Sequence, residues 1–163
     1  MNTGNVLFAV QDGVYVLKFV GDVRLEFGTR IDAFIDLLVG DPDMKGVLVD
    51  LTETVHVDST SLGLLGKLSS LSSARLKKVP VLVCHERGML RFLRTMGFSD
   101  LFEIVDRLPS PVVGATELPK VANGEELSRE SVLNAHKLLM GLNEHNAREF
   151  KDLVHMLEQG GRG

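Results

Sequence analysis

The sequence has few of the features that mark a secreted or membrane protein. Cys84 is the one cysteine among 163 residues, so no disulfide can form within the chain; this is typical of a reducing compartment. Apolar runs such as residues 47–49 and 79–84 are strand-sized and much shorter than the roughly 20 residues of a membrane span. The first residues show no basic region followed by an apolar segment and a cleavage site. We therefore expect a cytoplasmic protein without membrane contact.

The chain also lacks a net positive charge. The net charge is −4, whereas nonspecific nucleic-acid binding draws its affinity from Lys and Arg side chains that neutralise phosphates. Arg87, Arg91 and Arg94 share a face of one predicted helix, but no aromatic platform for stacking bases accompanies them. We interpret this face as solvated, or as attractive to an acidic partner, and we expect no direct contact with nucleic acid.

The motifs of common enzymes are also absent. No Gly-x-Ser-x-Gly elbow, phosphate-binding loop or dinucleotide fingerprint occurs, and the five histidines show no metal-ligand spacing. His56 lies near a serine cluster and is a candidate general base, but a solvent-facing loop histidine is the simpler interpretation. We expect no catalytic residue, no metal and no cofactor.

A receiver domain is a further alternative, because Asp50 ends a predicted buried strand, where such domains carry their phosphoacceptor aspartate. A receiver also needs acidic residues after its first strand to bind Mg²⁺. Here that strand is followed by the hairpin residues Gln11, Asp12 and Gly13. We interpret Asp50 as a strand-end residue that bonds to the following loop.

What is present is an alternation of short apolar segments. Two β-prone stretches, residues 6–10 and 14–20, flank Asp12-Gly13, a strong hairpin signal. Strands apolar on both faces imply a mostly parallel sheet covered by helices. The sequence thus predicts an α/β domain over residues 1–107, with a mixed, mostly parallel sheet of four to five strands. The remaining predicted helices are 31–38, 61–76 and 87–96, and the remaining strands are 46–51, 79–84 and 101–105.

The C-terminal third has a different pattern. Residues 108–124 hold three of the five prolines and show no periodicity, which is typical of a linker. Residues 125–159 are predicted to be helical, with apolar residues recurring at a spacing close to 3.5. Residues 125–158 then form a dimer or bind a second partner, fold as a hairpin broken at 141–143, or pack back on the first domain.

A polar cluster, Asp58-Ser59-Thr60-Ser61, lies between a buried strand and an apolar helix. Such residues commonly cap a helix N-terminus, but one cap needs one residue and here four follow one another. The same N-terminus favours negative charge, so a phosphorylated hydroxyl would be tolerated there. Gly63 and Gly66 each cost up to ~1 kcal/mol in a helix relative to alanine. They allow another surface to come close, either a partner or the sheet itself.

Residues 47–63 resemble the core signature of STAS domains, specifically the bacterial anti-sigma-factor antagonists. The family pattern is a strand ending in Asp-Leu, a short loop, and Asp-Ser-Ser/Thr-Gly-Leu-Gly opening a helix. The resemblance implies that Ser59 receives a phosphate, with Asp58 as the preceding acidic residue and Thr60 as the second hydroxyl. It extends more weakly over residues 6–105 and predicts a STAS-like fold.

One position departs from the family pattern. Ser61 replaces the usual glycine, so Thr60 and Ser61 stay alternative phosphate acceptors, whereas Leu62 and Gly63 match. The resemblance implies a partner-binding surface at the loop and the first turns of the helix. Its residues are Asp58, Thr60, Ser61, Leu62, Gly63 and Gly66.

The resemblance also implies a mechanism of partner switching that regulates sigma-dependent transcription. The unphosphorylated protein binds an anti-sigma factor or a switch kinase, and an ATP-using serine kinase phosphorylates Ser59 so that the complex dissociates. A metal-dependent serine phosphatase, including the type fused to a response regulator, restores binding. The antagonist is a substrate and not an enzyme. The alternatives are a STAS-type scaffold in a signalling complex without a sigma factor, or a small cytoplasmic enzyme.

Overall fold

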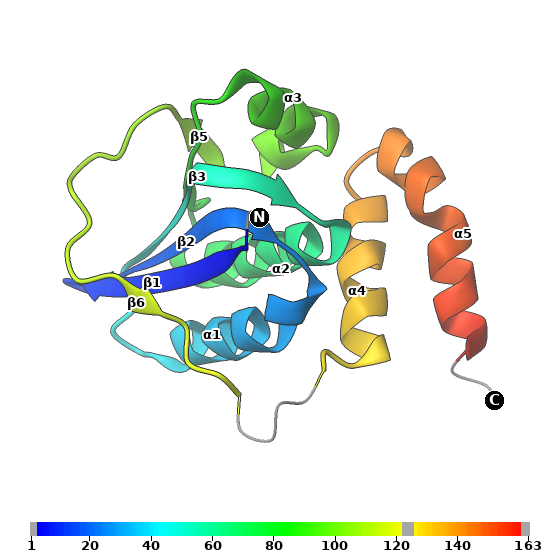
Figure 1. Ribbon diagram of the computed structural model, residues 1–163, viewed down its shortest axis with the longest axis horizontal. Helices are drawn as coiled ribbons and strands as arrows, with labels where there is room; N and C mark the ends of the chain where they lie inside the picture. The colour runs from blue at the N-terminus through cyan, green and yellow to red at the C-terminus, as the bar shows by residue number, and fades with distance from the viewer. Residues whose placement is uncertain (1–2, 122–125, 161–163) are drawn as a thin grey trace.

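A six-stranded mixed sheet forms the centre of the molecule (Figure 1). We describe a computed structural model in which residues 3–121 and 126–160 are placed. The strand order is β5-β4-β3-β2-β1-β6; β2 to β5 are parallel neighbours, and β1 is antiparallel to β2 and β6. The mixed, mostly parallel α/β sheet is confirmed. The strands are β1 Asn5–Gln11, β2 Val14–Val23, β3 Gly46–Val57, β4 Val81–Val83, β5 Glu103–Val105 and β6 Thr116–Glu117.

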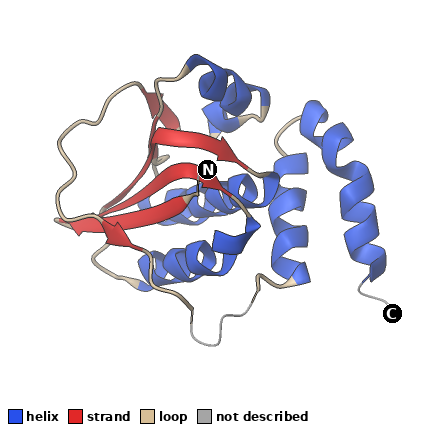
Figure 2. Cartoon of the chain, viewed as in Figure 1, coloured by secondary structure: helices blue, strands red, loops and turns tan. Residues whose placement is uncertain are grey.

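Helices α1 and α2 cover one face of the sheet, and two further helices form a C-terminal hairpin (Figure 2). The main apolar core joins one face of the sheet to α1 and α2. A smaller cluster on the other face includes Leu48 and Val83, against which Leu108 and Val112 pack. None of the helices in the described ranges is long and apolar enough to cross a membrane. The helices are α1 Gly28–Gly40, α2 Ser59–Leu76, α3 Arg87–Thr95, α4 Arg129–Met140 and α5 Glu144–Gly160, with the 3-10 turns η1 Leu25–Phe27 and η2 Phe98–Asp100.

The predicted hairpin at residues 12 and 13 is present. Asp12 and Gly13 both have positive φ angles, 51° and 83°, and Gln11 pairs with Val14 across the turn. Two consecutive residues of positive φ match the right-handed twist of the two strands. The hairpin joins β1 to β2, and β2 pairs with β3 on its other side. Strand β3 therefore lies within the body of the sheet.

Strand β3 is longer than the sequence predicts. It continues past Leu51 to Val57, and residues 53–57 pair with the end of β2 from Val20 to Val23. Asp50 therefore lies inside the strand rather than at its end, and its Oδ1 accepts hydrogen bonds from the Thr52 amide and hydroxyl at 2.9 and 2.7 Å. The prediction that Asp50 ends the strand was wrong. The residues that continue β3 are mostly exposed and polar, so their composition resembles that of a loop.

The segment predicted as a linker contributes to the sheet. Strand β6, from residues 116–117, pairs with β1, and the following Leu118 is buried in the main core. The sheet therefore has a sixth strand beyond the predicted four to five. Residues 122–124 of the linker and Glu125, the first residue of the predicted extension, lie outside the described residues. The division of the chain at residue 107 stays a prediction.

The C-terminal helices fold as a hairpin that packs back on the domain. Helix α4 ends at Met140 and α5 begins at Glu144, so the predicted break at 141–143 is confirmed. In Figure 1 α4 lies between α2 and α5. A dimer or a second partner at residues 125–158 stays a prediction.

Candidate functional site

Asp58 is the N-cap of helix α2. Its Oδ1 accepts a hydrogen bond from the Ser61 amide at 2.8 Å, and its Oδ2 accepts one from the Leu25 amide at 2.7 Å. An N-cap carboxylate satisfies one of the unpaired amides of the first turn. One side chain thus fixes both the start of α2 and the turn that follows β2. Because Asp58 supplies the cap, the three hydroxyl side chains after it are not needed for this role.

Ser59 lies in the first turn of α2 and contacts a histidine of α4. The distance from Ser59 Oγ to His136 Nε2 is 2.8 Å, and His136 Nδ1 lies 2.7 Å from the carbonyl oxygen of Val132. A carbonyl oxygen only accepts, so Nδ1 carries the proton; in the neutral ring Nε2 then accepts from the Ser59 hydroxyl. The His136 residue is 1% exposed, and its ring packs edge-on against Phe150. The hydroxyl of Ser59 is thereby held toward α4.

The other two hydroxyl residues are less accessible than Ser59. Thr60 is 7% exposed and Ser61 is fully buried, whereas Ser59 is half-buried. Ser61 Oγ has no hydrogen-bond partner among the described residues. Of the three candidate acceptors, Ser59 is the one that solvent reaches most easily.

The remaining predicted partner-binding residues face the interior or α4. Leu62 is fully buried in the main core. A Cβ atom placed on Gly63 would lie 2.5 Å from the Ala135 carbonyl oxygen, and one on Gly66 would lie 2.4 Å from Leu138 Cδ2. Both glycines therefore allow close approach of α4, which is the element that packs on this face in place of the sheet.

His136 is the site residue that sequence reasoning missed. It is separated from Ser59 by 77 positions, and it carries no motif. Its helical phase was a usable signal, because a residue one position after Ala135 and four after Val132 lies on the same side of the helix as the apolar stripe. That phase could not show which helix the stripe would meet.

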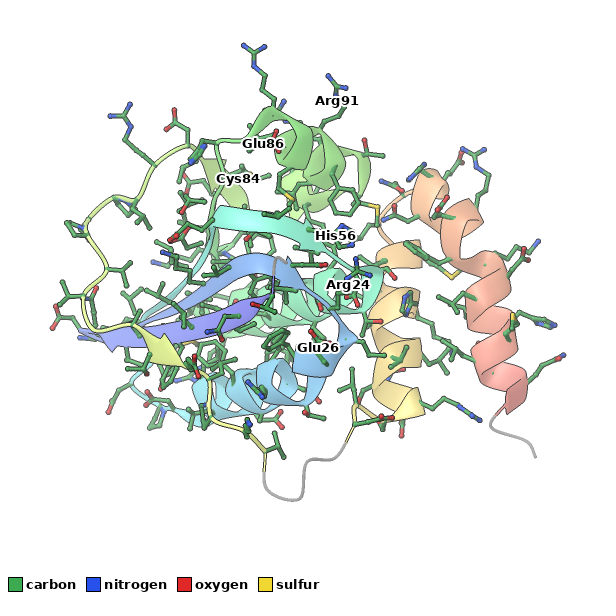
Figure 3. All side chains as sticks on the ribbon, viewed as in Figure 1. Arg24, Glu26, His56, Cys84, Glu86 and Arg91 are labelled. Atoms are coloured by element: carbon green, nitrogen blue, oxygen red, sulfur yellow. The ribbon has the colours of Figure 1, made fainter. Side chains whose placement is uncertain are left out.

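His56 does not contact the serine cluster as a general base. It lies on the exposed last part of β3 and not in a loop, as Figure 3 shows. Its ring forms no hydrogen bond within residues 3–121 and 126–160. Among the same residues no group of three or more potential ligands could hold a metal ion.

Helix α3 presents its arginines to solvent. Arg87, Arg91 and Arg94 are exposed, and Arg91 points away from the body of the molecule in Figure 3. The helix is capped by Glu86, whose carboxylate accepts from the Gly88 and Met89 amides at 2.8 and 2.6 Å. These two hydrogen bonds lower the pKa of Glu86.

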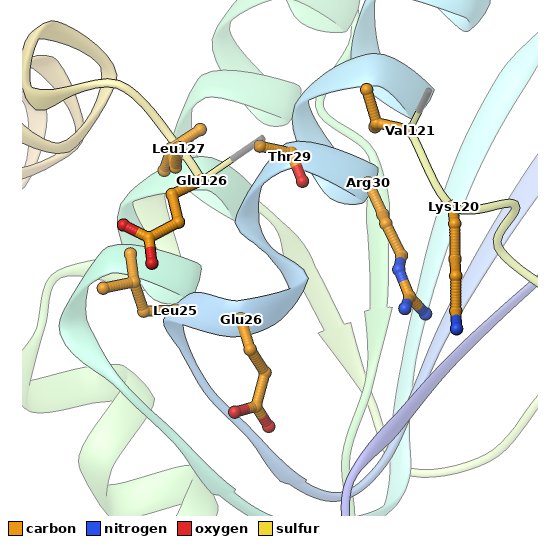
Figure 4. Close-up of a pocket in the computed structure, with 8 residues that line it drawn as sticks. All are labelled: Leu25, Glu26, Thr29, Arg30, Lys120, Val121, Glu126 and Leu127. Carbon is orange, nitrogen blue, oxygen red and sulfur yellow. The ribbon is translucent and has the colours of Figure 1, made fainter. Parts of the chain in front are cut away.

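A hollow of about 470 Å³ lies between the start of α1 and four later residues, Lys120, Val121, Glu126 and Leu127. Glu26, Arg30, Lys120 and Glu126 are among its lining residues, so it carries charges of both signs (Figure 4). Neither Ser59 nor His136 lines it. The residues that line the hollow include no histidine, serine or cysteine that would act as a nucleophile or base, and we do not assign it a chemical role.

The sequence matches no known family model and no curated protein. The structure is similar to the crystal structure of an anti-sigma factor antagonist from Mycobacterium paratuberculosis, with 19% identity and a TM-score of 0.53 over 65% of this chain and 88% of that one. A second similar structure is the anti-sigma factor antagonist SpoIIAA in its unphosphorylated form, with 17% identity, 63% and 87% coverage and a TM-score of 0.49. At 19% identity, the similarity to the first structure is evidence for a shared fold. The chain therefore has the STAS fold of an anti-sigma factor antagonist over about two thirds of its length.

Proposed function

We propose that this protein is an anti-sigma-factor antagonist whose binding state is set by phosphorylation of Ser59. The observation that carries the proposal is the position of Ser59 in a helix N-terminus whose cap is already supplied by Asp58. The hydroxyl of Ser59 is therefore free to have another role. It is also more exposed than those of Thr60 and Ser61, which favours it over these two alternatives.

The electrostatics of this position suit a phosphate switch. The N-terminus of α2 favours an anion, and a phosphate adds about −1.5 to −2 charges. In a closely packed interface that charge carries desolvation and repulsion costs. The unphosphorylated protein binds an anti-sigma factor or serine kinase at the first turns of α2, in the cytoplasm. Phosphorylation ends the binding and a serine phosphatase restores it.

A small enzyme is the second candidate function, and one observation favours it. A serine hydroxyl that donates to a histidine, whose other nitrogen is held by a third group, is the arrangement of an activated nucleophile. Here the third group is the Val132 carbonyl. However, the His136 ring is nearly inaccessible, and the hollow beside α1 is lined by neither residue. We therefore place the switch first, and a STAS-type scaffold without a sigma factor remains a further alternative.

Partner capture by charge variants of the full chain tests the switch. We expect Ser59→Ala to capture an anti-sigma factor or serine kinase from the source cell, and Ser59→Glu to lose about tenfold or more of that binding. Ser70→Glu is the matched control, because Ser70 is exposed on the same helix, and it should bind like the unmodified chain. Equal capture of one such partner by Ser59→Ala and Ser59→Glu would overturn the proposal.

A further inference from the structure

Helix α4 covers the face of α2 that the proposed function assigns to a partner. Ala135 lies against Gly63, Leu138 against Gly66, and His136 against Ser59. The chain thus already places an α-helix on this surface. The surface is shaped for a helix with a small side chain at the closest approach, because Gly63 leaves no room for a larger one.

The contact between α2 and α4 is closest at small residues, and one turn further along α4 the fully buried Leu139 belongs to the main apolar core. Gly63, Gly66 and Ala135 have small side chains or none, and so they bury little apolar surface where the helices cross. No salt bridge among the described residues joins the two helices. Hydrogen bonds attach the hairpin to the domain at the other end of α4, where Asn146 Nδ2 donates to the Met96 carbonyl and Asn143 Nδ2 to the Thr95 carbonyl, at 2.8 and 3.0 Å.

Helix α5 packs mainly on α4 and not on α2. Its buried residues are Asn146, Phe150 and Val154, and most of its remaining residues are exposed. The buried apolar residues that the hairpin adds to the main core are Leu139, Phe150 and Val154, fewer than those of the sheet with α1 and α2. The hairpin therefore has the contacts of a unit that can open as a whole while the sheet remains folded.

We infer that α4 is a removable cover of the Ser59 site, and that a helix of the partner takes its place on α2. The identity of that partner rests on the proposed function, whereas the opening of α4 does not. In the closed chain the half-buried Ser59 hydroxyl is hydrogen-bonded to His136, and full access of a kinase or a partner to it requires α4 to leave. A phosphate on Ser59 excludes either helix, because Oγ is 2.8 Å from a buried ring.

Amide hydrogen exchange of the unmodified full-length chain tests whether the cover opens. We expect amides of residues 132–139 in α4 to exchange at least about tenfold faster than those of residues 47–51 in β3, corrected for intrinsic rates. Amides of α5 should open together with those of α4. Equal protection of α4 and β3 would mean that α4 leaves only when the whole protein unfolds, and it would overturn the inference.

Thiol labelling of Ser59→Cys tests whether the cover limits access to the site. N-ethylmaleimide should label the introduced thiol about tenfold faster when Ala135→Leu is added, because the larger side chain cannot fit against Gly63. Lys137→Leu, an exposed position on the same helix, is the control and should stay within about twofold of the parent. Cys84 does not interfere, because it is buried and burial raises the pKa of its thiol.

The outcomes separate the inference from the function. If Ala135→Leu leaves the labelling rate unchanged, or if the α4 amides stay protected in it, α4 is not a removable cover. Neither result affects the proposal that Ser59 is a phosphorylation switch. The exchange measurement needs no variant, so it decides the matter even if Ala135→Leu does not fold. Equal partner capture by Ser59→Ala and Ser59→Glu overturns the switch and leaves the cover standing.

Discussion

Replacing Gly63 with alanine is expected to lower the free energy of unfolding by about 1–3 kcal/mol, although alanine is the better helix former. The added methyl group would lie 2.5 Å from the backbone oxygen of Ala135 and 2.7 Å from its Cβ. A backbone atom can move only with its helix, so α4 must shift or leave α2. We expect the loss of protection in the amide exchange experiment to concentrate in α4 and α5.

Two other glycines form a graded control series for this result. At Gly66 the nearest atom is the flexible end of the Leu138 side chain, so Gly66→Ala should cost less than Gly63→Ala. At Gly40, in α1, a Cβ meets no atom within 4 Å, and alanine there should stabilise by up to about 1 kcal/mol. Urea unfolding of the three variants measures the series. A Gly63→Ala chain as stable as Gly40→Ala would contradict the close packing of α4 on α2.

Asn146→Asp is expected to cost about 3 kcal/mol or more at neutral pH. Asn146 is fully buried, and its amide donates to the Met96 and Leu139 carbonyls. A carboxylate would turn two donor contacts into repulsion between oxygens, in a place that water does not reach. Since this amide attaches the hairpin near the end of α3, we expect the hairpin to detach.

The loss in Asn146→Asp should depend on pH with a definite sign. Burial among acceptors raises the folded-state pKa of the introduced carboxyl above its unfolded value of about 3.9. Stability is then highest below that unfolded value and falls as the pH rises toward the folded-state pKa. Asn143→Asp is the comparison variant and should lose less, because Asp can keep the cap contact to the Asn146 amide and gives up only the exposed donation from Asn143 Nδ2 to the Thr95 carbonyl. Urea unfolding at several pH values compares the two, and equal stability of both variants would contradict this account of Asn146.

The central part of the sheet was predicted from the sequence, whereas the second half of β3 and strand β6 were not. Period-two and apolar patterns located β1, β2, the first half of β3 and the main helices, because buried residues recur there at regular spacing. The second half of β3 was missed because residues 52–56 are partly or fully exposed and resemble a loop in composition. Strand β6 is two residues long and exposed, so it has no side-chain pattern and depends on backbone pairing with β1.

The site was predicted in part for a related reason. The cluster at residues 58–61 could be predicted because a helix cap and a helix start depend only on neighbouring residues. The structure identifies Asp58 as the cap among these four residues, and α2 begins at Ser59, two residues before the predicted start. His136 belongs to the site through tertiary packing of α4. Helical periodicity predicts that a face is buried and does not identify the helix it meets.

Mass spectrometry of the full-length chain, affinity-purified from its source cell, tests the central claim most directly. It reports in one experiment which proteins accompany the chain and which residue carries phosphate. We predict that an anti-sigma factor or serine kinase accompanies the unphosphorylated chain, and that the partner-free fraction carries phosphate on Ser59. Phosphate confined to Thr60, Ser61 or another residue, or a Ser59-phosphorylated chain still bound to such a partner, would contradict the account.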